Sequence, residues 1–350
     1  MKTFTQPMQG LKEFEDLEAA LPKLSGVIQI SGCIDAAKPH MMYSIGNGSG
    51  NRIIVTFQEQ KAKELAEEYR FFDPNVAYYP AKDILFYQSD IRGNVLTAER
   101  INALKMMAEK RSCTIVTTFD GLMNPMPSPD QFISAVRKVA VGDVIDLEQF
   151  TRHLAELGYE KNYQVQTSGE FSVRGGIIDI FPLTEELPVR IELWGDEVDS
   201  IRSFDTETQR SVEKLDEVQV YPATEMILSR NKIGEAVRRM KEEYKKQEEA
   251  FKKRKRLAEK ERLRKMTVRT EEELLSFGTA EGSEALLSYF YEKTVSFLEY
   301  LPENTLFFID EPHRVLEKGK TYEEEFFLCM QSRLEGGYVL PGQADLLFGY

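Results

Sequence analysis

Apolar and polar residues alternate along three neighbouring stretches in the middle of the chain. The alternation covers residues 177–181 and 189–194 and resumes around Val198. A repeat of two residues is typical of half-buried strands, and Gly195-Asp196 between the last two stretches favours a tight turn. The pattern therefore predicts antiparallel strands with one face toward a core.

Three residues in this region do not fit a purely structural hairpin. Arg174 precedes two glycines, Arg190 interrupts a strand, and Trp194, the only tryptophan of the chain, ends it. Alternation places Arg190 and Trp194 on one face, while Ile191 and Leu193 point to the other. Because arginine and tryptophan are enriched at binding hot spots, we expect Arg174, Arg190 and Trp194 to form one exposed protein-binding patch. In the alternative interpretation, Arg190 pairs with a neighbouring carboxylate and Trp194 is partly buried in the turn.

The same region resembles one module of two bacterial repair families. The motif GEFSVRGGIIDIFP begins at Gly169, and PVRIELWGDEVDSIRSFD begins at Pro188. Both are similar to the module that the damage-recognition subunit UvrB shares with the transcription-repair coupling factor (Mfd). In both families this module docks UvrA. The resemblance implies that Arg174, Arg190 and Trp194 contact UvrA, with Trp194 standing where relatives carry phenylalanine.

Strand-like and helix-like patterns alternate before this module. Strands are expected at residues 26–32, 51–57, 76–79 and 113–118, and helices at residues 11–21, 58–69 and 97–110. Such alternation is typical of βαβ units that build a parallel sheet.

The turn after the first expected strand lies where a nucleoside triphosphatase carries its phosphate loop. The sequence from Gly32 to Pro39 is GCIDAAKP, which lacks the second glycine and follows Lys38 with proline instead of a magnesium-binding hydroxyl. Asp35 would add a negative charge beside a bound phosphate. We therefore interpret this turn as the remnant of a nucleotide-binding ancestor.

A second remnant of a nucleotide site stands near the other end of the chain. Residues 304–313, NTLFFIDEPH, resemble a Walker B strand, in which Asp310 would bind magnesium and Glu311 would activate water. Without a phosphate loop these carboxylates have nothing to act on. The prediction is a degenerate, non-functional nucleotide site made of Gly32, Lys38, Asp310 and Glu311, and a return of the chain to the first sheet beyond residue 301.

Two differences favour the coupling factor over UvrB. UvrB has an intact phosphate loop, and it carries an aromatic-rich hairpin that wedges between DNA strands. The segment between Tyr79 and Thr97 is too short for that hairpin. The N-terminal part of the coupling factor resembles UvrB but has lost ATP hydrolysis, as expected here.

The remaining patterns complete the outline. Residues 131–139 are expected to form a strand or connector, residues 146–157 a helix, and residues 218–221 a strand that closes the sheet. Residues 230–269 are rich in lysine, arginine and glutamate at helical spacing and predict one long solvated helix, with DNA contact the less favoured interpretation. Residues 274–298 predict further helical packing.

Composition limits the function classes. The length of 350 residues predicts two or three domains, and the charged fraction of 29% is typical of a soluble globular protein. The formal net charge of −13 predicts weak or no DNA binding. Cysteines scattered along the chain favour a reducing, cytoplasmic location. Neither a membrane span nor a signal peptide is expected, and the three scattered cysteines have no metal-binding spacing. No histidine adjoins a plausible nucleophile. We expect no cofactor, no metal and no catalysis.

The expected fold is α/β. A degenerate helicase-like parallel-sheet domain derived from a phosphate-loop ancestor spans residues 1–130 and 301–350. A UvrA-binding α+β domain with an antiparallel sheet spans residues 131–222, and a small helical domain spans residues 223–300.

The expected function follows from the resemblance. The chain would be the N-terminal adaptor of a transcription-repair coupling factor, a fragment that recruits UvrA to stalled RNA polymerase in nucleotide excision repair. Contacts with RNA polymerase and DNA, and the ATP-dependent translocase, would belong to further regions of the full-length protein. The alternative is an ATP-dependent UvrB-like unwinding subunit. A structural clamp that holds the motor inactive is a third interpretation, compatible with the first.

Overall fold

A four-stranded parallel sheet forms the first part of the computed structural model, which describes residues 5–21, 26–48, 50–82, 92–109, 112–280 and 282–349. Its strand order is β12-β1-β3-β2, and every neighbouring pair is parallel. The strands are β1 (Arg52–Thr56), β2 (Val76–Tyr79), β3 (Thr114–Thr118) and β12 (Leu306–Ile309). The Walker-B-like strand thus joins the first sheet, as the sequence predicted.

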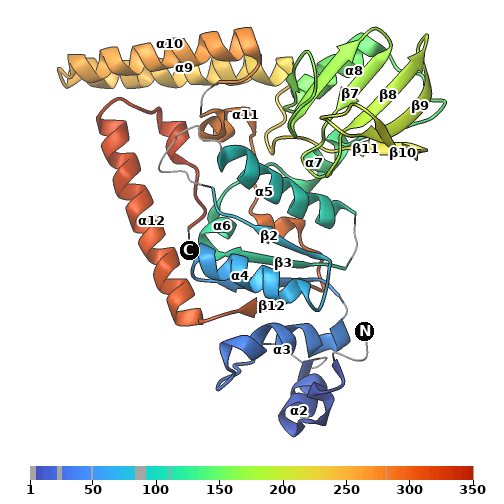
Figure 1. Ribbon diagram of the computed structural model, residues 1–350. Coiled ribbons are helices and arrows are strands. Elements are labelled where there is room, and N and C mark those ends of the chain that lie inside the picture. Colours follow the sequence, from blue (N-terminus) through green and yellow to red (C-terminus); the bar gives the residue numbers. More distant parts are fainter. Residues whose placement is uncertain are drawn as a thin grey trace.

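Helices cover both faces of this sheet (Figure 1). The helices α3 (Lys38–Ser44) and α4 (Glu59–Arg70) pack on the face that carries Ile54 and Val116. Helix α5 (Arg92–Ala108) packs on the face that carries Ile53 and Ile115, where Val315 of helix α12 (Pro312–Glu335) also lies. Consecutive strand residues therefore enter opposite cores, as parallel sheets buried on both faces require.

A six-stranded sheet of order β10-β9-β8-β7-β6-β5 forms the middle part, and only its β5–β6 pair is parallel. The strands are β5 (Glu160–Lys161), β6 (Glu170–Arg174), β7 (Ile177–Ile180), β8 (Val189–Trp194), β9 (Glu197–Phe204) and β10 (Ser211–Leu215). Helix α8 (Leu147–Glu156) places Leu154 in the core under one face. The Asp146 carboxylate caps this helix by accepting the Gln149 N–H at 2.8 Å, which confirms the predicted helix start.

The connections around this sheet differ from the prediction. Residues 131–139 form the end of helix α7 (Pro129–Ala135) and most of strand β4 (Arg137–Ala140). The strand expected at residues 218–221 is β11 (Glu217–Val220), and it pairs with β4 in a separate two-stranded sheet instead of closing the larger one. Both strands still bury Val139 and Val218 in the same core as α8.

Residues 230–269 do not form one long helix. They form helix α9 (Arg230–Lys253) and most of helix α10 (Leu257–Phe277), which fold back on each other as a hairpin (Figure 1). The chain reverses at Lys255, whose φ of 55° is left-handed. Ile233, Phe251 and Leu263 are buried between these helices, helix α11 (Leu287–Phe290) and the C-terminal part of α12. The apolar positions were too few to predict the hairpin because α11 and α12 supply the rest of this core.

Two other predictions concern the N-terminal half. The strand expected at residues 26–32 is absent: this described stretch has no regular structure, and Val27 is 98% exposed. The shortened hairpin segment falls largely on residues 83–91, which lie outside the described residues.

Helices α2 (Lys12–Ala20) and α6 (Phe119–Met123) complete the fold. Within the described residues, no helix is long and apolar enough to span a membrane.

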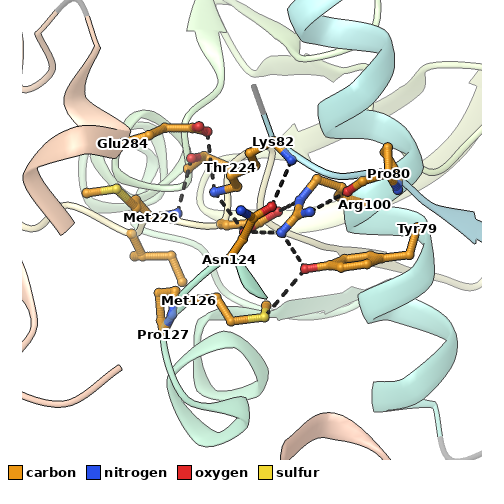
Figure 2. A network of polar contacts seen from close by, with 12 residues as sticks. Tyr79, Pro80, Lys82, Arg100, Asn124, Met126, Pro127, Thr224, Met226 and Glu284 are labelled. Carbon is orange, nitrogen blue, oxygen red and sulfur yellow. Dashed lines mark hydrogen bonds and ion pairs between the residues drawn. The ribbon is translucent and has the colours of Figure 1, made fainter. Parts of the chain in front are cut away.

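A buried polar network connects the parallel-sheet part to the segment between β11 and α9 (Figure 2). The Arg100 guanidinium of α5 donates to Glu225, to the Pro80 carbonyl and to the Tyr79 hydroxyl, and its side chain is 2% exposed. The Lys82 ammonium lies 3.0 Å from the Glu225 carboxylate. Because a buried charge without a partner is costly, removal of either partner would destabilise the contact between the two parts.

Candidate functional site

One buried carboxylate organises the face of the six-stranded sheet opposite α8. Asp179 of β7 has a side chain that is 1% exposed. Its Oδ1 accepts the Arg190 Nε at 2.7 Å, and its Oδ2 accepts the Arg190 Nη2 at 2.9 Å and the Arg174 Nη2 at 2.8 Å. Two arginines from the strands on either side of β7 thus share one anion.

Strand register produces this cluster. Asp179 lies directly opposite Arg190 on β8, and Arg174 of β6 lies opposite Ile177, two residues along β7. Because side chains alternate between faces, all three polar groups emerge on one face, while Ile178 enters the core on the other.

Arg190 is the more enclosed of the two arginines. Its Nη2 also donates to the Gln209 Oε1 at 3.0 Å, and its guanidinium lies 4.4 Å from the Phe204 ring centroid. The hydrogen bonds to Asp179 raise the pKa of Arg190. The Arg190 side chain is only 15% exposed, whereas that of Arg174 is 37% exposed. The pairing considered as the alternative for Arg190 is therefore present, and Arg174 is the arginine open to a partner.

Trp194 stands in solvent at the end of β8. The residue is 82% exposed, and it lies opposite Glu197 beyond a register irregularity between Glu192 and Leu193. Leu193 packs against the core as expected. An exposed tryptophan is an uncommon surface feature, because large aromatic side chains usually bury most of their area.

A second charged group on this face was not found from the sequence. The Glu192 Oε2 accepts the Arg202 Nη2 at 2.7 Å and the Ser200 Oγ at 2.8 Å. Glu192 lies between Arg190 and Trp194 along β8, so it continues the same face. The alternation of residues 189–194 contained this signal, but the partner on β9 depends on a register that a bulge alters.

A separate cluster brings together three residues of the predicted degenerate nucleotide site. The Lys38 Nζ lies 2.7 Å from the Asp310 Oδ1, 2.7 Å from the Asp35 Oδ1 and 3.3 Å from the Glu311 Oε1. The Thr56 Oγ1 donates to the Asp310 Oδ2 at 3.3 Å. Burial opposes the ammonium charge, but these carboxylates outweigh it and raise the pKa of Lys38.

The structure brings Lys38, Asp310 and Glu311 together at the carboxyl ends of β1 and β12, but Gly32 does not join them in any described contact. Gly32 has a φ of 80° in an exposed turn. The Lys38 ammonium is neutralised by carboxylates of its own chain. Within the described residues, no group of three or more histidine, cysteine or acidic side chains is suited to a metal ion.

Comparisons with known proteins bear on the site. Residues 138–226, which contain the whole six-stranded sheet, match the family model of the UvrB interaction domain. Over 336 aligned residues the chain is 31% identical to the transcription-repair-coupling factor of Bacillus subtilis. The aligned region covers 94% of this chain and 28% of that protein. It is 28% identical to the factor of Staphylococcus aureus (strain bovine RF122 / ET3-1), over 99% of this chain and 30% of the relative.

The chain is also 32% identical to the UvrABC system protein B of Thermosipho africanus, over 83% of this chain and 44% of that protein. The chain is thus homologous to the N-terminal region of the transcription-repair-coupling factors and contains a UvrB interaction domain, which relates it to nucleotide excision repair. It spans 28–30% of the length of the coupling factors it matches.

Proposed function

We propose that this chain is the adaptor region of a transcription-repair coupling factor and that the outer face of its six-stranded sheet binds UvrA. In the full-length protein this contact would bring UvrA to a stalled RNA polymerase, while the polymerase contact and the DNA translocase would lie in other regions. The observation that carries the proposal is the 82% exposure of Trp194 on the strand that also carries Arg190 of the Arg174–Asp179–Arg190 cluster.

The cluster has the chemistry of a protein-binding site. Asp179 fixes both guanidinium groups in place, so little side-chain entropy is lost when a partner binds Arg174. Only one nitrogen of Arg174 is used by Asp179, which leaves further donors for a carboxylate or carbonyl of the partner. Trp194 would provide the large apolar contact that often dominates such interfaces.

Trp194→Ala is the decisive test, because this side chain supports little of the fold. Binding of purified UvrA to the chain would be measured by calorimetry, and truncation of a central tryptophan is expected to weaken it by tenfold or more. Tyr163→Ala is the matched control, because Tyr163 is an aromatic residue that is 87% exposed just beyond the edge strand β5, three strands from β8.

Equal binding by the folded Trp194→Ala variant and the parent would reject the assigned site. Failure of the parent itself to bind UvrA would reject the proposed function. A loss with Tyr163→Ala as large as that with Trp194→Ala would place the contact elsewhere on the sheet.

A further inference from the structure

The turn of the α9–α10 hairpin carries five consecutive cations, Lys252-Lys253-Arg254-Lys255-Arg256, in a chain whose net charge is −13. We propose that this hairpin tip is a binding site for the phosphodiester backbone of nucleic acid. The proposal concerns a different surface from the UvrA-binding face and does not depend on it.

The cations of the hairpin fall into two groups. Along the rest of the two helices, here called the shaft, many arginines and lysines pair with glutamates of the same or the adjacent helix: Arg238–Glu242 at 2.7 Å, Lys241–Glu271 at 2.5 Å and Arg264–Glu261 at 2.7 Å. Lys245, Lys246 and Lys265 are exposed on the shaft, and no ion pair involves them within the described residues. The pairs neutralise much of the shaft charge, as expected of a solvated helical face.

The tip differs. Lys253, Arg254 and Lys255 are all exposed, and within the described part of the chain no ion pair involves them. Lys252 is held by Glu248 at 3.4 Å and Glu249 at 2.8 Å. The tip therefore differs from the shaft in having three consecutive exposed cations without an ion pair at the reversal of the chain.

Local structure would favour other residues at two of these positions. Lys255 adopts a φ of 55°, where glycine is the preferred residue and a side chain costs about 1 kcal/mol. Arg256 is the N-cap of α10 and makes no capping hydrogen bond, although serine, threonine, aspartate and asparagine are the stabilising choices. A cation is also unfavourable at the positive end of a helix dipole. Residues whose backbone conformation, helix capping or charge is locally unfavourable are typical of functional sites.

The tip is accessible from outside the fold. The Arg262 guanidinium lies 4.3 Å from the Tyr338 ring centroid and donates to the Gly336 carbonyl, which anchors α10 to the segment after α12. Beyond this anchor the hairpin continues to its free end (Figure 1). Leu257, the first residue of α10, is 67% exposed.

A phosphate backbone is the ligand that this chemistry fits. Clustered lysines and arginines attract closely spaced phosphates, and without base-reading side chains such contacts are independent of sequence. With three to four cations and an acidic protein behind them, the dissociation constant is expected in the micromolar range and should rise steeply with salt. A log–log salt slope near −3 is expected for this number of phosphate contacts on duplex DNA.

The test measures binding of the whole chain to a fluorescent 30-base-pair duplex by anisotropy at several potassium chloride concentrations. The variant Lys253→Gln/Arg254→Gln/Lys255→Gln should bind at least tenfold more weakly and with a shallower salt slope. The control Arg238→Gln/Lys241→Gln/Arg264→Gln removes the same charge from the paired shaft and should bind within about twofold of the parent.

Equal weakening in the two triple variants would show that only overall charge matters and would overturn the proposal. Undetectable binding by the parent at 100 μM protein in about 50 mM salt would also overturn it. Poly-glutamate that competes as well as unlabelled duplex at equal charge would assign the tip to an acidic protein surface instead and would overturn it too.

Discussion

Asp179 lies opposite Arg190 in the β7–β8 register and accepts two hydrogen bonds from its guanidinium, at 2.7 and 2.9 Å. The carboxylate is buried, whereas the arginines around it reach the surface. Arg190 therefore has two roles on the proposed UvrA-binding face. It neutralises a buried charge, and its side chain keeps 15% of its area exposed on this face.

Substitution of Asp179 tests this dual role. In Asp179→Ala both arginines lose their shared acceptor, so we expect the free energy of unfolding in urea to fall by about 2 kcal/mol. UvrA binding should weaken as well, because Arg174 and Arg190 are no longer fixed. Glu148→Gln is the control, because its pair with Arg152 lies on α8, on the other side of the sheet, and is exposed enough to contribute little. An Asp179→Ala variant that matches the parent in both measurements would contradict the role.

Arg190→Ala is expected to lower both the stability of the fold and the affinity for UvrA, whereas Trp194→Ala should lower mainly the affinity. It leaves Asp179 with only the hydrogen bond from Arg174, so the melting temperature should fall together with UvrA affinity. The comparison is measured by thermal unfolding and calorimetry on the same preparations. If Arg190→Ala unfolds at the temperature of the parent, Asp179 does not depend on this pair.

Sequence patterns predicted the central part of this face because a two-residue repeat is local. The strands β7 and β8, the face of Arg190 and the core position of Leu193 all follow from the alternation. The buried acceptor was not identified, since Asp179 resembles any polar residue in a half-buried strand. Its burial is set by arginines on two neighbouring strands and by Gln209 and Phe204 beyond them.

Nucleotide binding gives an independent test of the Lys38 cluster. We expect calorimetry with magnesium and ATP to detect no micromolar binding, because Lys38 is already neutralised by Asp35, Asp310 and Glu311. Three carboxylates would in addition repel the phosphates. Binding at micromolar concentration would contradict this prediction and revive the alternative of an ATP-dependent unwinding subunit.

The sequence predicted a degenerate phosphate loop, but it did not reveal the ion cluster around Lys38. The GCIDAAKP motif contains Asp35 and Lys38 three residues apart. Asp310 lies 272 residues after Lys38 in the sequence, so the pattern of residues gave no sign that the two side chains meet. The strand predicted at residues 26–32 is absent for a similar reason. Its apolar residues have the right composition, but no described strand of the four-stranded sheet pairs with them.

Glu225 should make the chain sensitive to acid. Burial opposes ionisation of Glu225, but Arg100 and Lys82 outweigh it and lower its pKa to about 2. Because this value lies below the value of about 4.3 in an unfolded chain, the ionised group stabilises the fold above pH ~4.3, and this contribution is lost as the pH falls toward 2. Glu225→Gln should cost about 3 kcal/mol at pH 7.

The pH dependence separates titration of Glu225 from packing defects. Urea denaturation at pH 7, 4 and 3 should show the stability difference between the parent and Glu225→Gln shrinking as the pH falls, since glutamine does not titrate. Glu284→Gln is the control, because Glu284 is half exposed and lies 3.6 Å from Lys82 at the margin of the network. A constant difference between parent and Glu225→Gln would contradict the pKa direction.

Lys255→Gly should change stability and DNA binding in opposite directions. Glycine adopts the left-handed backbone of the hairpin turn without steric cost, so we expect the free energy of unfolding to rise by about 0.5–1 kcal/mol despite the greater freedom of the unfolded chain. Removal of one exposed cation should at the same time weaken binding to duplex DNA about twofold to threefold. Lys253→Gly removes the same charge from the last turn of α9, where glycine disfavours the helix, so that variant should lose both stability and binding. If Lys255→Gly gains stability and binds DNA like the parent, the lysine is retained for a reason other than phosphate contact.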